Sequence, residues 1–195
     1  TFENIEYIIK RKKWGYLINN VAYRIGSLHF ERTSMKEINK CITVGIYPII
    51  KLTKLMLSLD SPPKIINITA QNTFSTDLFN LTPSITLPFL NVYEGVNNFQ
   101  QAFGESLLKE GKNVLNIQPG AVKTKNTARF LKQAEPLVVD AKSFVSSAMK
   151  YIGEKGSYVV HWKHKLADFF VNIFPFVKGC CFKSVGRDIA MSLDS

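Results

Sequence analysis

Tyr93 and the residue one helical turn after it are the side chains with the clearest catalytic potential in this sequence. The stretch 90–99 reads LNVYEGVNNF, so Asn97 follows Tyr93 by four positions. On a helix these two residues share one face. A phenol can donate a proton to a developing alkoxide, but its ordinary pKa of about 10 suits neutral pH poorly. Asn97 can supply hydrogen bonds but no charge.

These two residues must be positioned by the elements around them. Helical and strand-like patterns alternate along the chain, which favours an α/β fold with a parallel sheet and helices on both faces. We expect strands at 16–19, 65–68, 114–117 and 157–161, and helices over 2–13, 35–59, 93–110 and 141–153. The helix containing Tyr93 should bury Val96, Phe99, Phe103 and Leu107.

Local signals predict where the helices begin, bend and end. Ser34 and Glu37 form a capping-box pattern that opens the second helix. Pro48 lies inside that helix and predicts a kink or a break near residues 46 and 47. Asp140 is placed to cap the helix after it, and Gly111 to end the helix of Tyr93.

The motifs of this chain, taken in order, resemble those of the short-chain dehydrogenase/reductase family. Residues 14–22 are similar to the family's strand ending in Asn-Asn-x-Gly, and residues 64–69 to the strand that carries the catalytic serine. Residues 113–124 are similar to the strand and Pro-Gly-x-x-x-Thr loop around the nicotinamide. With 142–153 and an aromatic tail, the chain looks closest to the 17-beta-hydroxysteroid dehydrogenase and very-long-chain 3-oxoacyl-CoA reductase branch.

The resemblance implies a Rossmann-like doubly wound sheet and a role for each matching residue. It implies one incomplete domain, 1–195, in which 163–195 form an aromatic-rich helical tail. Tyr93 takes the catalytic tyrosine position. The cofactor-binding positions are Asn19, Asn20, Asn97, Pro119, Gly120 and Thr124.

Three of the four catalytic positions depart from the family pattern. The lysine position holds Asn97, the serine position holds Ala70 with Thr69 before it, and the relay asparagine falls near Gly45. A unit charge at roughly 4 Å is worth up to about 4 kcal/mol at an effective dielectric near 20. A lost oxyanion donor costs about 3 to 4 kcal/mol. Thr69, Thr73 or Ser75 could replace the serine hydroxyl, and Lys123 or Lys125 could replace the charge.

The cofactor motif of the family is missing from this sequence. No Gly-x-x-x-Gly-x-Gly segment occurs in the 195 residues, and that turn seats the cofactor's pyrophosphate at a helix N-terminus. We therefore expect this chain to bind NADP(H) weakly or not at all. The sequence begins at Thr1, so either the turn lies upstream or the protein has lost its cofactor half.

Composition bounds the partners. The chain is 46% hydrophobic with three cysteines, which fits one domain without a disulfide framework. The chain has a net charge of +10, but its sequence contains no recognised nucleic-acid-binding module, so we expect no nucleic-acid partner. The aromatic-rich stretch 166–177, flanked by lysines, suits either a membrane interface or a lid over a substrate pocket. His161 and His164 lack further ligands, so we expect no metal site.

Two functions remain from this reading. The first is a degenerate short-chain dehydrogenase/reductase, non-catalytic or nearly so, that binds a lipid, a steroid-like molecule or a protein partner. The second is an active NADPH-dependent 3-oxoacyl-CoA or 17-beta-hydroxysteroid oxidoreductase whose cofactor half lies upstream. Both readings place the protein at the endoplasmic reticulum membrane surface or in the cytoplasm, with a homodimer as one possible assembly.

Overall fold

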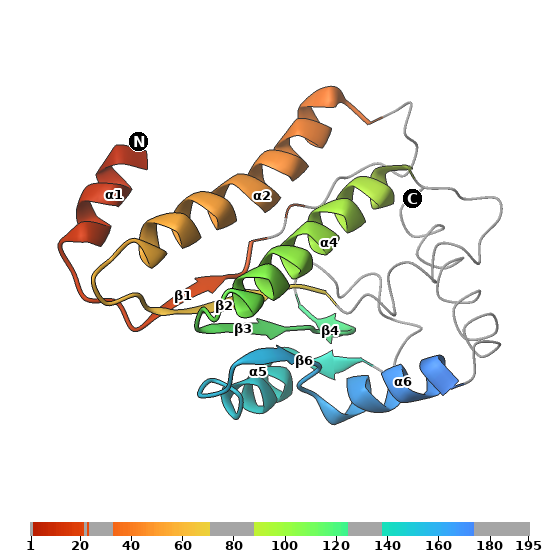
Figure 1. Cartoon of the computed structure of the whole chain (residues 1–195). Coiled ribbons are helices and arrows are strands. Elements are labelled where there is room, and N and C mark those ends of the chain that lie inside the picture. The colour runs from red at the N-terminus through yellow and green to blue at the C-terminus, as the bar shows by residue number, and fades with distance from the viewer. Residues whose placement is uncertain (1, 22, 24–32, 71–87, 125–137, 174–195) are drawn as a thin grey trace.

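The fold is built on a parallel β-sheet with helices on both of its faces. The computed structural model describes residues 2–21, 23, 33–70, 88–124 and 138–173 (Figure 1). Its main sheet has the strand order β1-β2-β3-β6, with every pair parallel. These strands are β1 (Tyr16–Asn19), β2 (Lys64–Ile68), β3 (Val114–Ile117) and β6 (Gly156–Tyr158). A second, two-stranded sheet pairs β4 (Val122–Lys123) with β5 (Val139–Asp140).

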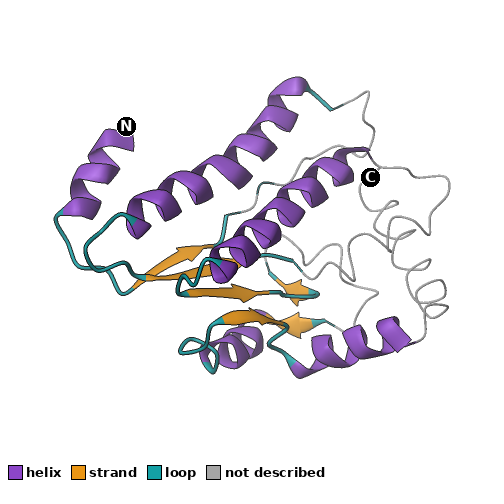
Figure 2. Cartoon of the chain, viewed as in Figure 1, coloured by secondary structure: helices purple, strands orange, loops and turns teal. Residues whose placement is uncertain are grey.

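The helices divide between the two faces of the main sheet. Figure 2 shows one group of helices on one side of the sheet and a second group on the other. The first group is α1 (Phe2–Lys10), α2 (Met35–Leu57) and α4 (Pro88–Lys109). The second group is α5 (Ala141–Met149) and α6 (Trp162–Ile173). This arrangement confirms the predicted α/β class with a doubly wound parallel sheet.

Each face of the sheet has its own apolar core. Successive strand residues point to opposite faces, so neighbours in sequence enter different cores. The core beneath α1, α2 and α4 contains Ile9, Leu55, Met56, Ile65, Leu107 and Val114. The core beneath α5 contains Ile66, Leu115, Ile117, Val139, Phe144 and Val160.

Most of the expected boundaries agree with the structure. The strands at 16–19 and 114–117 are confirmed, and the capping box of Ser34 and Glu37 is present with both of its hydrogen bonds. Asp140 caps α5, with its Oδ1 atom accepting from Ser143 N at 2.9 Å. Gly111 follows α4 with a φ of 77°, which favours glycine. The last strand is shorter than the expected 157–161 and begins one residue earlier: β6 spans Gly156–Tyr158.

Of the kink or break predicted at Pro48, the break is wrong, because α2 continues through the proline from Met35 to Leu57. The proline ring removes one intrahelical hydrogen bond from the turn before it. That turn is held from outside, since Gln100 of α4 donates through Nε2 to the Gly45 carbonyl oxygen at 2.9 Å. The carbonyl that loses its partner is that of Val44, so the bond from Gln100 adds a contact to the same turn without replacing the lost one.

A row of polar side chains crosses the interior of the sheet. Asn19, Asn67, Asn116 and Ser157 occupy the same register on β1, β2, β3 and β6. Asn19 donates to Asn67 at 2.8 Å, Asn67 to Asn116 at 2.9 Å, and Asn116 to Ser157 at 2.9 Å. Ser157 then donates to Glu105 of α4. We call these four strand residues the asparagine row.

Gly104 allows α4 to lie directly over the asparagine row. A Cβ at Gly104 would meet Asn116 Oδ1 at 2.1 Å, far inside any real contact. Glycine is therefore required by the close approach of the helix to the sheet. The row, Gly104 and Glu105 together fix the position of α4, and α4 carries the residues with catalytic potential.

Candidate functional site

The candidate site lies at the carboxyl edge of the main sheet. In open parallel sheets, ligands bind outside the carboxyl ends of the strands. Here β1 is followed by Asn20, β2 by Thr69 and Ala70, and β3 by a loop containing Pro119 and Gly120. Tyr93 and Asn97 belong to α4, which covers this sheet (Figure 1). The backbone thus brings most of the sequence-predicted residues to one edge.

Asn97 has an unusual environment for an amide. Its side chain is buried, with 6% of its surface exposed, and its Nδ2 atom has no hydrogen-bond partner among the described residues. Gln101, one turn later, has an unpaired buried Oε1 atom. An unsatisfied buried group costs about 1 to 3 kcal/mol. Tyr93 lies on α4, but its side chain is outside the described part of the structure.

Gly45 leaves no room for the relay asparagine of the family. A Cβ at Gly45 would lie 2.4 Å from Val96 Cγ1, so the γ-methyl of α4 fills that space. Gly45 is buried where α2 and α4 meet. An asparagine side chain would force these helices apart. The departure at this position is therefore supported by the packing around it.

The two candidates for the serine position differ in burial. Ala70 is half-buried and carries no hydroxyl. Thr69 is buried, and its Oγ1 atom donates to the Ile117 carbonyl oxygen at 3.3 Å. Its hydroxyl proton is therefore used within the sheet. The other two candidates, Thr73 and Ser75, lie outside the described residues.

Asn19 and Asn20 have different surroundings, although both were matched to the cofactor pocket. Asn19 is buried, and its Nδ2 atom donates to Asn67 Oδ1 and, at 3.3 Å, to Thr53 Oγ1. Its amide protons are used inside the protein. Asn20 is exposed at the end of β1. Of the two, Asn20 is the one placed to meet a ligand.

The loop after β3 is held by a histidine that the sequence reading assigned no role. Gly120 donates its backbone N–H to His164 Nδ1 at 3.2 Å, and His164 Nε2 lies 3.3 Å from the Ala121 carbonyl oxygen. His164 is fully buried on α6. Pro119 and Gly120 are half-buried, whereas Lys123 and Thr124 are exposed. Lys125 lies outside the described residues.

His161 completes a small polar cluster beside His164. Their ring centroids are 5.5 Å apart, and His161 Nε2 lies 3.2 Å from Ser143 Oγ. Burial lowers the pKa of both imidazoles below the ordinary value, which favours their neutral forms. The part of the chain that the structure describes contains no group of three residues able to hold a metal ion.

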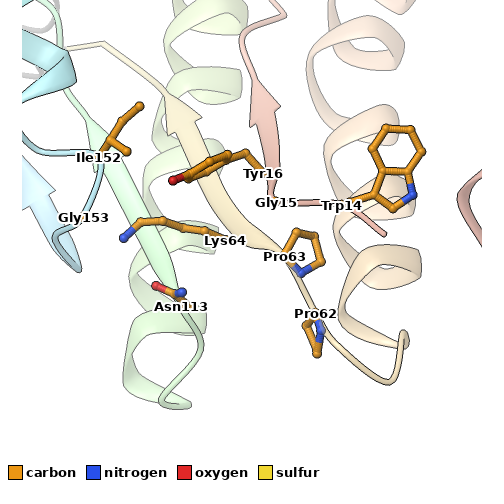
Figure 3. Close-up of a pocket in the computed structure, with 9 residues that line it drawn as sticks. All are labelled: Trp14, Gly15, Tyr16, Pro62, Pro63, Lys64, Asn113, Ile152 and Gly153. Carbon is orange, nitrogen blue, oxygen red and sulfur yellow. The ribbon is translucent and has the colours of Figure 1, made fainter. Parts of the chain in front are cut away.

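A shallow depression lies at the opposite, amino-terminal edge of the sheet. It has a volume of about 370 Å³, and Figure 3 shows Tyr16 and Lys64 extending toward Ile152 and Gly153. Lys64 Nζ donates to the Glu154 carbonyl oxygen at 2.5 Å, and burial lowers the pKa of its ammonium. Because this depression lies away from α4's Asn97 and the strand ends, it is separate from the candidate site.

None of the helices in the described ranges combines the length and apolar character needed to cross a bilayer.

Comparisons with known proteins show which solved structures share this fold. No protein-family model and no curated protein matches the sequence. Among solved structures, the chain is similar to a short-chain dehydrogenase/reductase of Serratia marcescens, with a TM-score of 0.57, 14% identity, and coverage of 80% of this chain and 69% of that one. The bulky-bulky ketone specific alcohol dehydrogenase of Comamonas testosteroni is also similar, with a TM-score of 0.60, 17% identity, and coverage of 90% of this chain and 67% of that one. A third similar structure is a short-chain dehydrogenase of Sphingobium yanoikuyae in complex with NADPH. Its TM-score is 0.60 at 16% identity, and the match covers 90% of this chain and 69% of that one.

The chain therefore has the Rossmann-like fold of the short-chain dehydrogenase/reductases, over about two thirds of the length of these structures. At such low identity the likeness defines the fold and leaves the activity to be argued from the site.

Proposed function

We propose that this protein is a degenerate short-chain dehydrogenase/reductase that has lost catalysis, or nearly so, and that binds a lipid or steroid-like molecule through the inherited site. The observation that carries this proposal is Asn97. The family's lysine position holds an amide that is 6% exposed and has an unpaired Nδ2 atom among the described residues. A neutral donor there can orient a ligand but supplies no positive charge beside the Tyr93 phenol.

Two further departures support the loss of catalysis. Gly45 faces Val96 so closely that no relay side chain fits. Ala70 lacks a hydroxyl, and the hydroxyl of Thr69 donates to Ile117. With Asn97, these departures remove the lysine charge, the relay side chain and one hydrogen-bond donor to a developing oxyanion. A loss of about 4 kcal/mol from the charge alone corresponds to roughly three decades in rate.

The residues at the carboxyl edge fit the nicotinamide-ribose end of NADP(H) in one respect. The buried Nδ2 atom of Asn97 is a donor in need of an acceptor, and a ribose hydroxyl would provide one. When bound, the cofactor would supply hydride chemistry. Asn97 and the loop of Pro119 and Gly120 would hold and orient it. The sequence offers no glycine-rich turn for the pyrophosphate, so we expect weak affinity.

The choice of a lipid or steroid-like ligand rests on the sequence resemblance to the hydroxysteroid and 3-oxoacyl-CoA reductase branch. The alternative is an active NADPH-dependent reductase of such ketones. It is favoured by Tyr93, which keeps the position of the proton donor on α4. In that case a substitute group must activate the phenol, and exposed Lys123 is a described candidate.

Restoring the missing groups tests the proposal. In the full-length polypeptide, we would measure NADPH oxidation with 3-oxoacyl-CoA and steroid ketones for the wild type and for the double variant Asn97→Lys with Ala70→Ser. We expect a wild-type rate near the uncatalysed background and a measurable rise in the double variant. Asn97→Gln with Ala70→Ser serves as the matched control, because it restores the hydroxyl without the charge. A wild type that already turns over rapidly would contradict the proposal.

A further inference from the structure

The outer face of α6 carries a compact group of large apolar side chains. Trp162 is 63% exposed, Leu166 46% and Phe169 56%. Phe170 is 44% exposed and Ile173 51%. We call these five residues the α6 apolar face. At about 100° per residue, they fall within an arc of about 100° on the helix surface. Large contiguous apolar patches on a protein surface often mark sites that bind another protein or a membrane.

The opposite face of α6 fixes the helix to the protein. His164 is fully buried and bonded to the loop at Gly120, and Ala167 is 6% exposed. His164 also packs near Phe144 of α5, with ring centroids 6.2 Å apart. Because these contacts orient the helix, the α6 apolar face is directed away from the core. In Figure 1, α6 lies at the outer side of the molecule, beyond β6.

Positive charge borders the α6 apolar face on both sides. On the helical wheel, Lys163 and Lys165 lie at the two margins of the apolar arc. Lys165 is exposed, and its Nζ atom donates to Tyr151 Oη at 2.7 Å. The whole chain has a net charge of +10. A helix with tryptophan, phenylalanine and leucine on one face and lysines beside them suits the interface of an anionic bilayer.

We propose that the α6 apolar face binds an anionic lipid surface, with Trp162, Leu166 and Phe169 entering the boundary between headgroups and acyl chains. Lys163 and Lys165 contact lipid phosphates at its margins. This inference goes beyond the proposed function and does not rest on it, because surface binding requires neither a cofactor nor a pocket. The carboxyl-edge loop is bonded to the same helix through His164, so the candidate site would lie close to the membrane.

Vesicle flotation tests this surface. The 195-residue chain would be mixed with phosphatidylcholine vesicles, with and without phosphatidylserine. We expect binding that requires phosphatidylserine and weakens with salt, as screening predicts. Phe169→Glu with Leu166→Glu should weaken binding about tenfold or more. Lys163→Gln with Lys165→Gln should weaken it on phosphatidylserine vesicles by about tenfold.

The matched control lies on another helix. Met35 and Tyr47 of α2 are exposed apolar residues, at 64% and 56%, so Met35→Glu with Tyr47→Glu adds the same charge elsewhere. This variant should bind vesicles almost as well as the wild type. Far-ultraviolet circular dichroism and thermal melting check that each variant is folded.

Tryptophan emission provides a second readout. Trp14→Phe leaves Trp162 as the single tryptophan of the chain, which has two. Its emission should shift to shorter wavelength when phosphatidylserine vesicles are added. Absence of binding, or equal weakening by the α2 control, would overturn the inference. So would a concentration-dependent dimer that Phe169→Glu dissociates without any vesicle binding, because a second copy would then cover this face.

Discussion

The asparagine row and Asn97 are both made of buried amides, yet they have opposite hydrogen-bonding states. Within the row, Asn19, Asn67 and Asn116 each donate an amide proton to the next side chain across the sheet. On α4, Asn97 holds a buried donor with no partner in the described part of the chain. A paired interior amide stabilises the fold, whereas an unpaired buried donor costs free energy and is available to an acceptor on a ligand. The contrast separates amides that hold the scaffold together from an amide at the candidate site that lacks a described partner.

The largest effect should come from crowding the contact between α4 and the asparagine row. Gly104→Ala places a Cβ 2.1 Å from Asn116 Oδ1, and both groups are held by rigid elements. We expect a loss of about 3 kcal/mol or more in the free energy of unfolding, measured by urea denaturation. Gly95→Ala, with nothing within 4 Å of its Cβ, is the control and should stabilise α4 by up to about 1 kcal/mol. Equal effects would show that α4 does not rest on the row.

Removing one member of the asparagine row should have the next largest effect. Asn67→Ala deprives Asn116 Oδ1 of its donor and Asn19 Nδ2 of its nearest acceptor, and it leaves a void at a position 2% exposed. We expect a loss of about 2 to 3 kcal/mol in the free energy of unfolding. A change below about 0.5 kcal/mol would contradict the structural role given to the row.

The same substitution at Asn97 should behave differently. Asn97→Ala removes a buried Nδ2 atom that has no partner among the described groups, and alanine favours a helix. We therefore expect no loss, and a gain of up to about 1 kcal/mol, in urea denaturation without ligand. A loss comparable to that of Asn67→Ala would mean that Asn97 is a structural residue, and the comparison between the two regions would fail.

The smallest expected effect is a pH dependence of the stability that arises from His164. Burial lowers its pKa below the ordinary value of 6.5; His161 and Lys163 act in the same direction, and the Ala121 carbonyl opposes them. The unfolded chain then binds more protons just below pH 6.5, so stability is complete above that value and falls as the pH decreases.

We expect Tm to be lower at about pH 5.5 than at about pH 7.5, and His164→Gln to reduce that difference. Glutamine can keep both bonds to the loop at Gly120 and Ala121, so the variant separates charge from geometry. His161, whose pKa is lowered mainly by burial, accounts for the remaining dependence. An unchanged pH profile in the variant would contradict this account of the cluster.

Local signals explain which elements the sequence predicts well. The strand at 114–117 is a short apolar run between a glycine turn and a Pro-Gly loop, and the helix after Ser34 begins with a capping box whose bonds involve only neighbouring residues. Both depend on nearby residues alone. The break predicted at Pro48 does not occur, and the contact found in the turn before it, from Gln100 to Gly45, joins positions 55 residues apart.

The site was less predictable, because its properties depend on register and on helix packing. Nothing in the motif around Asn67 reveals that its neighbours across the sheet are also asparagines until the strands are aligned. Gly45 and Gly104 are required by close contacts with Val96 and Asn116, which no spacing shows. The link from His164 to Gly120 joins positions 44 residues apart.

The most direct test of the central claim is the turnover of NADPH by the wild-type full-length polypeptide compared with its Tyr93→Phe variant. Both would be assayed with 3-oxoacyl-CoA and steroid ketones at saturating cofactor. A protein that has lost catalysis should give the same background rate in both forms, while a fluorescent lipid or steroid ligand still binds each. A wild-type rate that Tyr93→Phe abolishes would contradict the account, since it would show that the phenol remains active beside Asn97.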